Sequence, residues 1–255
     1  GLLLVVLYAI YVIIKAWLDP KSAPATPVPE EERKTLWREV IVALVPPLLL
    51  IVAVLGSILG GIATPTEAAS VGSVGALILA LMRGKLNFTI LKQVVISAAT
   101  ITSMVFIILF GAAVFSVVFR MMGGDALVHE FLSSMPGGTV GAIVIVMLVM
   151  FLLGFILDTF EIIFIVIPIT APVLLALGVD PIWLGVMVGV NLQTSFLTPP
   201  FGFALFYLRG VAPSSITTGM IYKGVIPFVL LQISALVTLF MFPDLITWLP
   251  RMLYN

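Results

Sequence analysis

The feature that most constrains this chain is a series of long apolar stretches separated only by short polar clusters. We delimit these stretches as 1–17, 40–61, 67–82, 93–119, 139–157, 160–177, 182–208 and 225–243. Roughly 20 helical residues cross the hydrocarbon core of a bilayer, which is about 30 Å thick. Charged residues make up only 9% of the sequence, whereas a soluble domain carries about 25%. The bilayer must therefore solvate most of the chain, and we predict an all-α polytopic membrane protein.

The composition also excludes several classes of function. The formal net charge is zero, and no basic cluster is dense enough for nucleic acid. The chain has no cysteine and a single histidine, His129, which excludes thiolate and multi-histidine metal sites. No nucleophile and base stand at a recognisable catalytic spacing, so we do not expect an enzyme. Because the chain begins at Gly1 inside an apolar stretch, without the basic segment of a signal peptide, we expect a fragment of a longer protein.

Two parts of the chain interrupt the simple pattern of spanning helices. The stretches 139–157 and 160–177 are short, and they are separated by Asp158 and Thr159. They are either two tight spans or one re-entrant helical hairpin. The stretch 182–208 is interrupted at 198–202 by the sequence Thr-Pro-Pro-Phe-Gly, which predicts a broken transmembrane helix.

The broken helix carries the first candidate site. Its two prolines remove two amide donors and free carbonyl oxygens upstream, and bare backbone at that depth is tolerated only where it is buried or lines a cavity. With the hydroxyls of Thr194, Ser195 and Thr198, these carbonyls would be oxygen ligands for a small hard cation. Secondary transporters commonly build their sites from such broken helices. The alternative is a proline kink whose hydroxyls bond to carbonyls one turn earlier.

The turn between 139–157 and 160–177 carries a second candidate. Asp158 and Glu161 are carboxylates three residues apart in otherwise apolar chain. A charge at the centre of a membrane helix costs at least about 2.5–3.5 kcal/mol, so it usually faces a cavity or a partner. The alternative is a plain cytoplasmic turn between two short spans.

The segment from Thr64 to Glu67 is the third candidate. Thr64 or Thr66 can cap a helix that begins at Pro65 or Glu67, and Glu67 would lie near its positive end. Capping alone explains the segment, and direct ion ligation is the alternative.

These motifs, in this order, resemble the large membrane subunit (DctM-like) of TRAP transporters. The resemblance is carried by Gly60–Ala69, Met135–Gly138, Leu157–Glu161, Asn191–Gly202, Val225–Phe228 and Trp248–Pro250. It implies a fold of the ion-transporter superfamily, with two inverted repeats, each with a re-entrant hairpin and a broken helix, that works as an elevator. It also implies a small membrane subunit (DctQ-like), a periplasmic substrate-binding protein (DctP-like), and the N-terminal half of the same subunit as partners in a prokaryotic inner membrane.

The resemblance implies the following division, which also agrees with the distribution of Lys and Arg about the spans. The first part comprises a transmembrane helix at 1–18, a cytoplasmic linker at 19–39 and scaffold-type helices at 40–92. The segment 93–138 holds a transmembrane helix and an outer interfacial arm helix (125–135). The transport domain at 139–210 contains hairpin 139–177 and broken helix 182–208, and the segment 211–255 holds an inner arm helix (214–223) and the last transmembrane helix.

The resemblance also assigns roles to individual residues. Sodium, as the coupling ion and the sole cofactor, would be bound by Gly154, Asp158, Thr159, Thr194, Ser195, Thr198 and Pro199. Substrate would be bound by Asn191, Gln193, Pro200 and Gly202, and a structural or gating role would fall to Thr64, Pro65, Thr66 and Glu67.

We therefore expect the permease subunit of a sodium-driven, binding-protein-dependent uptake system for organic acids such as dicarboxylates, sialic acid or other sugar acids. The alternative is a proton-coupled organic-anion carrier or antiporter of the same superfamily, without a binding protein, in which Asp158, Glu161 and Glu67 carry protons. The basic residues Arg120 and Arg209 are predicted at helix ends, so the sequence offers no midplane cation for a carboxylate.

Overall fold

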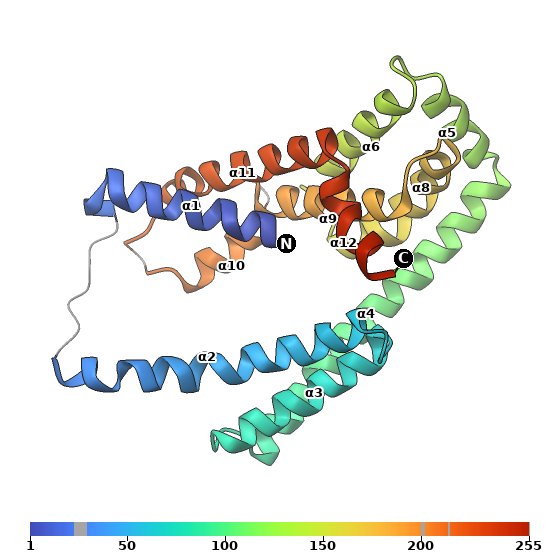
Figure 1. The fold of residues 1–255 in the computed structure, drawn as a ribbon. Coiled ribbons are helices and arrows are strands. Elements are labelled where there is room, and N and C mark those ends of the chain that lie inside the picture. The colour runs from blue at the N-terminus through green and yellow to red at the C-terminus, as the bar shows by residue number, and fades with distance from the viewer. Residues whose placement is uncertain (23–29, 200–201, 214, 255) are drawn as a thin grey trace. The chain divides into compact units, whose positions relative to one another are not determined.

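The computed structural model describes residues 1–22, 30–199, 202–213 and 215–254, and the regular structure in these ranges is helical throughout (Figure 1). The helices are α1 (Leu2–Leu18), η1 (Pro20–Ser22), α2 (Glu30–Leu59), α3 (Pro65–Met82), α4 (Phe88–Met121), α5 (Gly124–Ser133), α6 (Thr139–Leu153), α7 (Thr159–Glu161), η2 (Ile162–Val166), α8 (Ile167–Ala176), α9 (Pro181–Leu197), α10 (Phe203–Val211), α11 (Thr218–Met241) and α12 (Asp244–Tyr254).

Within the described residues, five helical segments are long and apolar enough to cross a membrane: Leu36–Leu59, Pro65–Met82, Phe88–Met121, Thr159–Ala176 and Thr218–Met241. Most of their large apolar side chains are exposed, as expected where lipid replaces water. The prediction of an all-α polytopic membrane protein is confirmed. The elevator motion that the resemblance implies stays a prediction.

The chain divides into two compact units, one formed by 19–101 and the other by 1–18 with 102–255. In the first unit, α2 and α3 pack closely because glycines of α3 face α2. A Cβ atom at Gly75 would lie 2.3 Å from Cδ1 of Leu50, and one at Gly72 would lie 3.2 Å from Cγ2 of Val54. Small residues that let helix backbones approach are typical of packing in membranes.

In the second unit, α9 is the central helix and packs on α6, α10, α11 and α12. Its buried face is apolar along most of its length, and Trp183 donates a hydrogen bond from Nε1 to the carbonyl oxygen of Leu239 in α11, at 3.1 Å. The core around it is formed by Ile143, Val146, Met150, Leu174, Leu184, Met187, Val188 and Leu192.

The segments α6 and η2–α8 form a helical hairpin whose turn begins at Gly154. Thr139 Oγ1 at the start of α6 donates to the carbonyl oxygen of Leu177 just after α8, at 3.3 Å, and this contact closes the base of the hairpin. The 15 residues of α6 rise about 22 Å, which is less than the roughly 30 Å hydrocarbon core. Of the two arms, α6 is thus too short to cross the core by itself, whereas Thr159–Ala176 is long enough. The re-entrant hairpin stays a prediction.

The C-terminal region differs from the predicted division. An inner arm helix at 214–223, separate from a span at 225–243, was expected, but α11 is continuous from Thr218 to Met241. Thr217 caps it by accepting from the N–H of Met220 at 3.3 Å. Gly224 is tolerated inside a helix, and it is not followed by a second cap that would start a new one. At the other end of the chain, α2 begins at Glu30, inside the segment predicted as a linker.

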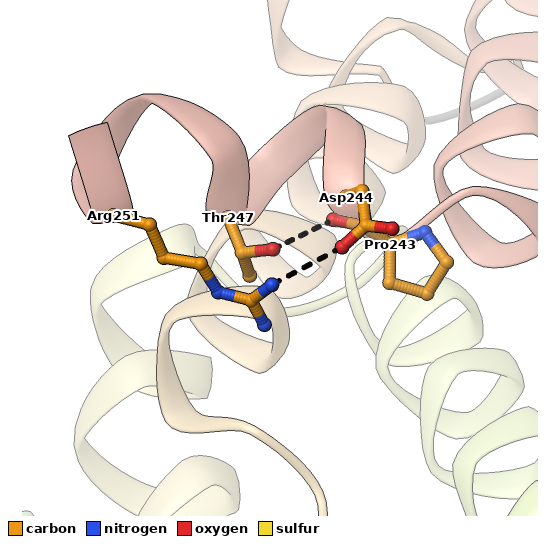
Figure 2. Close-up of polar contacts among 4 residues, drawn as sticks. All are labelled: Pro243, Asp244, Thr247 and Arg251. Atoms are coloured by element: carbon orange, nitrogen blue, oxygen red, sulfur yellow. Dashed lines mark hydrogen bonds and ion pairs between the residues drawn. The ribbon is translucent and has the colours of Figure 1, made fainter.

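The helix α12 is an element that the sequence patterns did not predict. Figure 2 shows two of its side chains turned back toward its start. Thr247 Oγ1 donates to the carbonyl oxygen of Pro243 at 3.5 Å, and Arg251 forms an ion pair with Asp244, with Nη1 and Oδ1 3.3 Å apart.

Candidate functional site

The broken helix is the centre of the candidate site. The helix α9 ends at Leu197, Thr198 has extended backbone angles, and α10 begins only at Phe203. Pro199 explains the break, because a proline ring disfavours helical geometry in the residue before it. Pro200, which we assigned to substrate binding, lies outside the described residues.

The three hydroxyls near the break are buried or half-buried and donate to the backbone of their own helix. Thr194 Oγ1 donates to the carbonyl of Val190 at 2.7 Å, and Thr198 Oγ1 to the carbonyl of Thr194 at 2.7 Å. Ser195 Oγ donates to the carbonyl of Leu192 at 2.9 Å. This is the back-bonding of a proline kink. It remains compatible with cation binding, because a hydroxyl that donates its proton retains lone pairs on oxygen.

Gly202 lets the chain fold back onto the end of α9. A Cβ atom at this position would lie 2.8 Å from the carbonyl oxygen of Phe196 and 3.1 Å from that of Thr198. Both neighbours are backbone atoms, which cannot rotate out of the way. The break thus gathers carbonyl oxygens from separate residues around one small residue, an arrangement suited to a hard cation.

The hairpin meets the broken helix at Gly154 and Ser195. Gly154 follows the last residue of α6, and a Cβ atom there would lie 2.2 Å from Oγ of Ser195 and 2.8 Å from its Cβ. Ser195 is only 1% exposed, so the close contact with Gly154 lies inside the unit. The structure therefore brings together two of the predicted ion-site residues, which are distant in sequence.

The carboxylates at the hairpin turn cap the short helix α7. The N–H of Thr159 donates to Oδ1 of Asp158 at 2.7 Å, and the N–H of Asp158 donates to Oε2 of Glu161 at 3.3 Å. This reciprocal capping box explains why two acids stand three residues apart. The helix then widens into a single π-helical turn at η2, a feature frequent at functional sites.

The two polar residues assigned to substrate, Asn191 and Gln193, lie on different faces of α9. Asn191 is buried and donates from Nδ2 to the carbonyl oxygen of Met147 in α6, at 2.8 Å. It lines a cavity of about 280 Å³ together with Met187 of α9 and Phe240 of α11. Gln193 is exposed. Positions two apart on a helix do not face each other, so within this unit the two side chains do not contribute to the same site.

Sequence reasoning missed one polar pair in this unit. Gln232 of α11 is 1% exposed, and its Oε1 has no hydrogen-bond partner among the described residues. The half-buried Tyr8 of α1 lies beside this side chain. The signal was present in the sequence, because an amide inside an apolar span is rare enough to be noted.

The segment from Thr64 to Glu67 belongs to the other unit and forms a complete helix cap there. The N–H and Oγ1 of Thr64 each donate to Oε2 of Glu67 at 2.8 Å. In return, the N–H of Glu67 donates to Oγ1 of Thr64 at 3.4 Å, with Pro65 as the first helical residue and Thr66 exposed behind it. The carboxylate of Glu67 is thus committed to capping α3.

Among the described residues, no three His, Asp or Glu side chains gather in one place. A cation at the broken helix would therefore be held mainly by hydroxyl and carbonyl oxygens.

Comparison with known proteins gives one family and several relatives. Residues 1–245 match the family model of the DctM component of the tripartite ATP-independent periplasmic transporters. A C4-dicarboxylate TRAP transporter large permease protein from Vibrio cholerae is 31% identical over 81% of this chain and 50% of its own length. A 2,3-diketo-L-gulonate TRAP transporter large permease protein from Escherichia coli is 30% identical over 78% and 47%. A sialic acid TRAP transporter permease protein from Haemophilus influenzae is 28% identical over 95% and 38%. The chain spans about half the length of the curated relatives it matches.

Proposed function

Since this chain belongs to the DctM component family of the tripartite ATP-independent periplasmic transporters, we propose that it is part of the large permease subunit of an uptake system for organic acids. The substrates named for its relatives, a C4-dicarboxylate, a diketo-gulonate and sialic acid, are all organic acids and support this class. A DctQ-like small membrane subunit, a DctP-like periplasmic binding protein and the other half of the large subunit would be its partners in the inner membrane.

The coupling ion in this proposal is sodium, and its site is the junction of the hairpin with the broken helix. The observation that carries the proposal is the close approach of Gly154 to Ser195 beside the gathered carbonyls of Phe196 and Thr198. Oxygen ligands of this kind suit a small hard cation. Hairpin and broken helix would move together in the elevator step, because Gly154 and Ser195 hold them in close contact.

The proton-coupled alternative is less well supported. It needs carboxylates that are available to take up and release protons during transport. Both Asp158 and Glu161 accept hydrogen bonds from backbone N–H groups in a capping box, and Glu67 does so in the other unit. Helix capping explains all three acids without transport chemistry.

The deciding experiment measures uptake into liposomes that contain the full-length large subunit with its small subunit, supplied with its binding protein. Uptake of a labelled organic acid is followed with an inward sodium gradient, with a pH gradient, and with neither. We expect sodium to drive uptake. Uptake that ignores sodium and follows the pH gradient would overturn the sodium proposal.

The ion site is tested with Thr198→Val and a matched control, Thr238→Val. Both threonines are half-buried and donate to a carbonyl four residues earlier, at 2.7 Å and 2.8 Å, but Thr238 belongs to α11 and not to the broken helix. A contact to a charged group contributes about 1.5–3 kcal/mol, so losing the Thr198 oxygen should raise the half-saturating sodium concentration at least about tenfold. Equal effects of the two variants would remove Thr198 from the site.

A further inference from the structure

A second polar site lies at the corner between α4 and α5, away from the broken helix. A cavity of about 330 Å³ is lined there by Arg120 at the end of α4, by Asp125 and His129 of α5, and by Pro168, Ile169, Pro172 and Val173 of α8. Its volume is within the range of small-molecule sites, which begins at about 300 Å³. The transport proposal uses none of these side chains.

The corner that forms this cavity is built by two glycines. Gly123 has a positive φ of 80°, which favours glycine, and a Cβ atom at Gly124 would lie 2.5 Å from the ring of Phe119. The chain therefore turns back tightly after α4, and α5 packs against α8. This turn brings Asp125 to the same side as Arg120.

The charged groups of the cavity are only loosely paired. Arg120 Nε and Asp125 Oδ2 are 3.7 Å apart, and their side chains are 60% and 57% exposed. A direct charge-assisted hydrogen bond would be about 2.7–2.9 Å long. His129 has a weak contact at 3.5 Å between Nδ1 and Oγ of Ser133. All three groups can therefore accept an external ligand with complementary charges.

The opposite wall of the cavity is apolar. It includes Pro168 and Pro172 of α8. Ile169 and Val173 complete this wall with aliphatic side chains. A ligand with a charged head and an apolar body fits a cavity with these two sides.

The apolar surroundings of this cavity favour a position at the surface of the bilayer. Met121 and Met122 beside it are 83% and 80% exposed, and Leu127 and Phe131 of α5 are 67% and 53% exposed. Such a concentration of apolar side chains on a short amphipathic helix is typical of a helix lying at the level of the headgroups. Lipid is the ligand available at that level.

We propose that this cavity binds the headgroup of a phosphatidylethanolamine-type phospholipid, with the phosphate at Arg120 and His129 and the ammonium at Asp125. The cavity offers one fixed cation, one anion and an imidazole, which match a zwitterion that can donate hydrogen bonds. The headgroup of phosphatidylglycerol would leave Asp125 facing a negative ligand. The quaternary ammonium of phosphatidylcholine cannot donate a hydrogen bond to Asp125.

The test is native mass spectrometry of the purified full-length subunit with phosphatidylethanolamine, phosphatidylglycerol or phosphatidylcholine of identical acyl chains. We expect phosphatidylethanolamine to bind with the highest affinity. Since a contact to a charged group contributes about 1.5–3 kcal/mol, Arg120→Gln should weaken its binding about tenfold or more, and Arg120→Lys should retain most of it. Asp125→Asn should weaken phosphatidylethanolamine and strengthen phosphatidylglycerol, which reverses the preference.

The matched control is Asp244→Asn, which removes the acid of another exposed ion pair, with Arg251 in α12 (Figure 2). It should leave the order of lipid affinities unchanged. Phosphatidylglycerol bound best by the unmodified protein would overturn the proposal. An order of lipid affinities that Asp125→Asn leaves unchanged would also overturn it. Because the order is measured among lipids within one variant, it does not depend on equal stability of the variants.

Discussion

The closest approach in the candidate ion site predicts a strong effect for Gly154→Ala. The added Cβ atom would lie 2.2 Å from Oγ of Ser195 and 2.8 Å from its Cβ. Heavy atoms without a bond between them rarely come closer than about 3 Å, and their attraction is best at about 3.5–4.0 Å. One helix must therefore shift by about 1 Å, or Ser195 must leave its position.

Ser195 cannot move cheaply. It is 1% exposed, and rotating its hydroxyl would break the 2.9 Å hydrogen bond to the carbonyl oxygen of Leu192. Overpacking of a well-packed core costs about 1–3 kcal/mol. We expect Gly154→Ala to reduce the free energy of unfolding by this amount and to weaken sodium-dependent uptake.

A compensating change separates packing from ion binding. Ser195→Gly removes the two nearest atoms that the new methyl group would meet and leaves the carbonyl oxygen of Met150, at 3.3 Å. The Gly154→Ala, Ser195→Gly double variant should therefore recover most of the lost stability. Directly contacting residues show coupling energies of about 0.5–3 kcal/mol in such cycles. If the Ser195 hydroxyl is an ion ligand, the double variant will be stable but will still require more sodium than the unmodified protein.

The assays are thermal unfolding in detergent for stability and the sodium dependence of uptake in liposomes. Gly154→Ala with unchanged stability and unchanged sodium dependence would refute the inferred contact. A double variant with full stability and normal sodium dependence would retain the contact but remove Ser195 from the ligands.

Three further substitutions test other parts of the structure. Asp158→Ala should lose the α7 cap and about 0.5–2 kcal/mol of stability. Asp158→Asn should retain most of this stability, because asparagine is an equally good cap. A similar loss in both variants would argue that the charge itself is required. Thr64→Ala should destabilise α3 by a similar amount without altering sodium dependence, which the same two assays measure. Gly202→Ala should impair uptake more than Gly210→Ala, because a Cβ atom at Gly210 meets nothing within 4 Å; equal uptake by the two variants would show that the fold-back at the break is not needed.

Local chemistry explains what the sequence by itself determined. The shortage of charge dictated a bilayer as solvent, since 9% charged residues cannot cover a water-soluble surface. The end of α9 at Leu197 follows from Pro199, because a proline lacks an N–H and restricts its predecessor wherever it occurs. The cap at Thr64 follows in the same way from a hydroxyl, a proline and a glutamate in fixed order. Each of these features depends on atoms within one turn of the chain.

Only the tertiary structure decided which of these residues meet. The contact of Gly154 with Ser195, the separation of Asn191 from Gln193 and the cavity beside Arg120 all depend on which face of a helix turns toward another helix. In a water-soluble protein the apolar face reveals this from the sequence. In a membrane, lipid-facing and protein-facing surfaces are both apolar, so the periodicity that would mark the buried face is largely absent, and the pairing of helices becomes visible only in three dimensions.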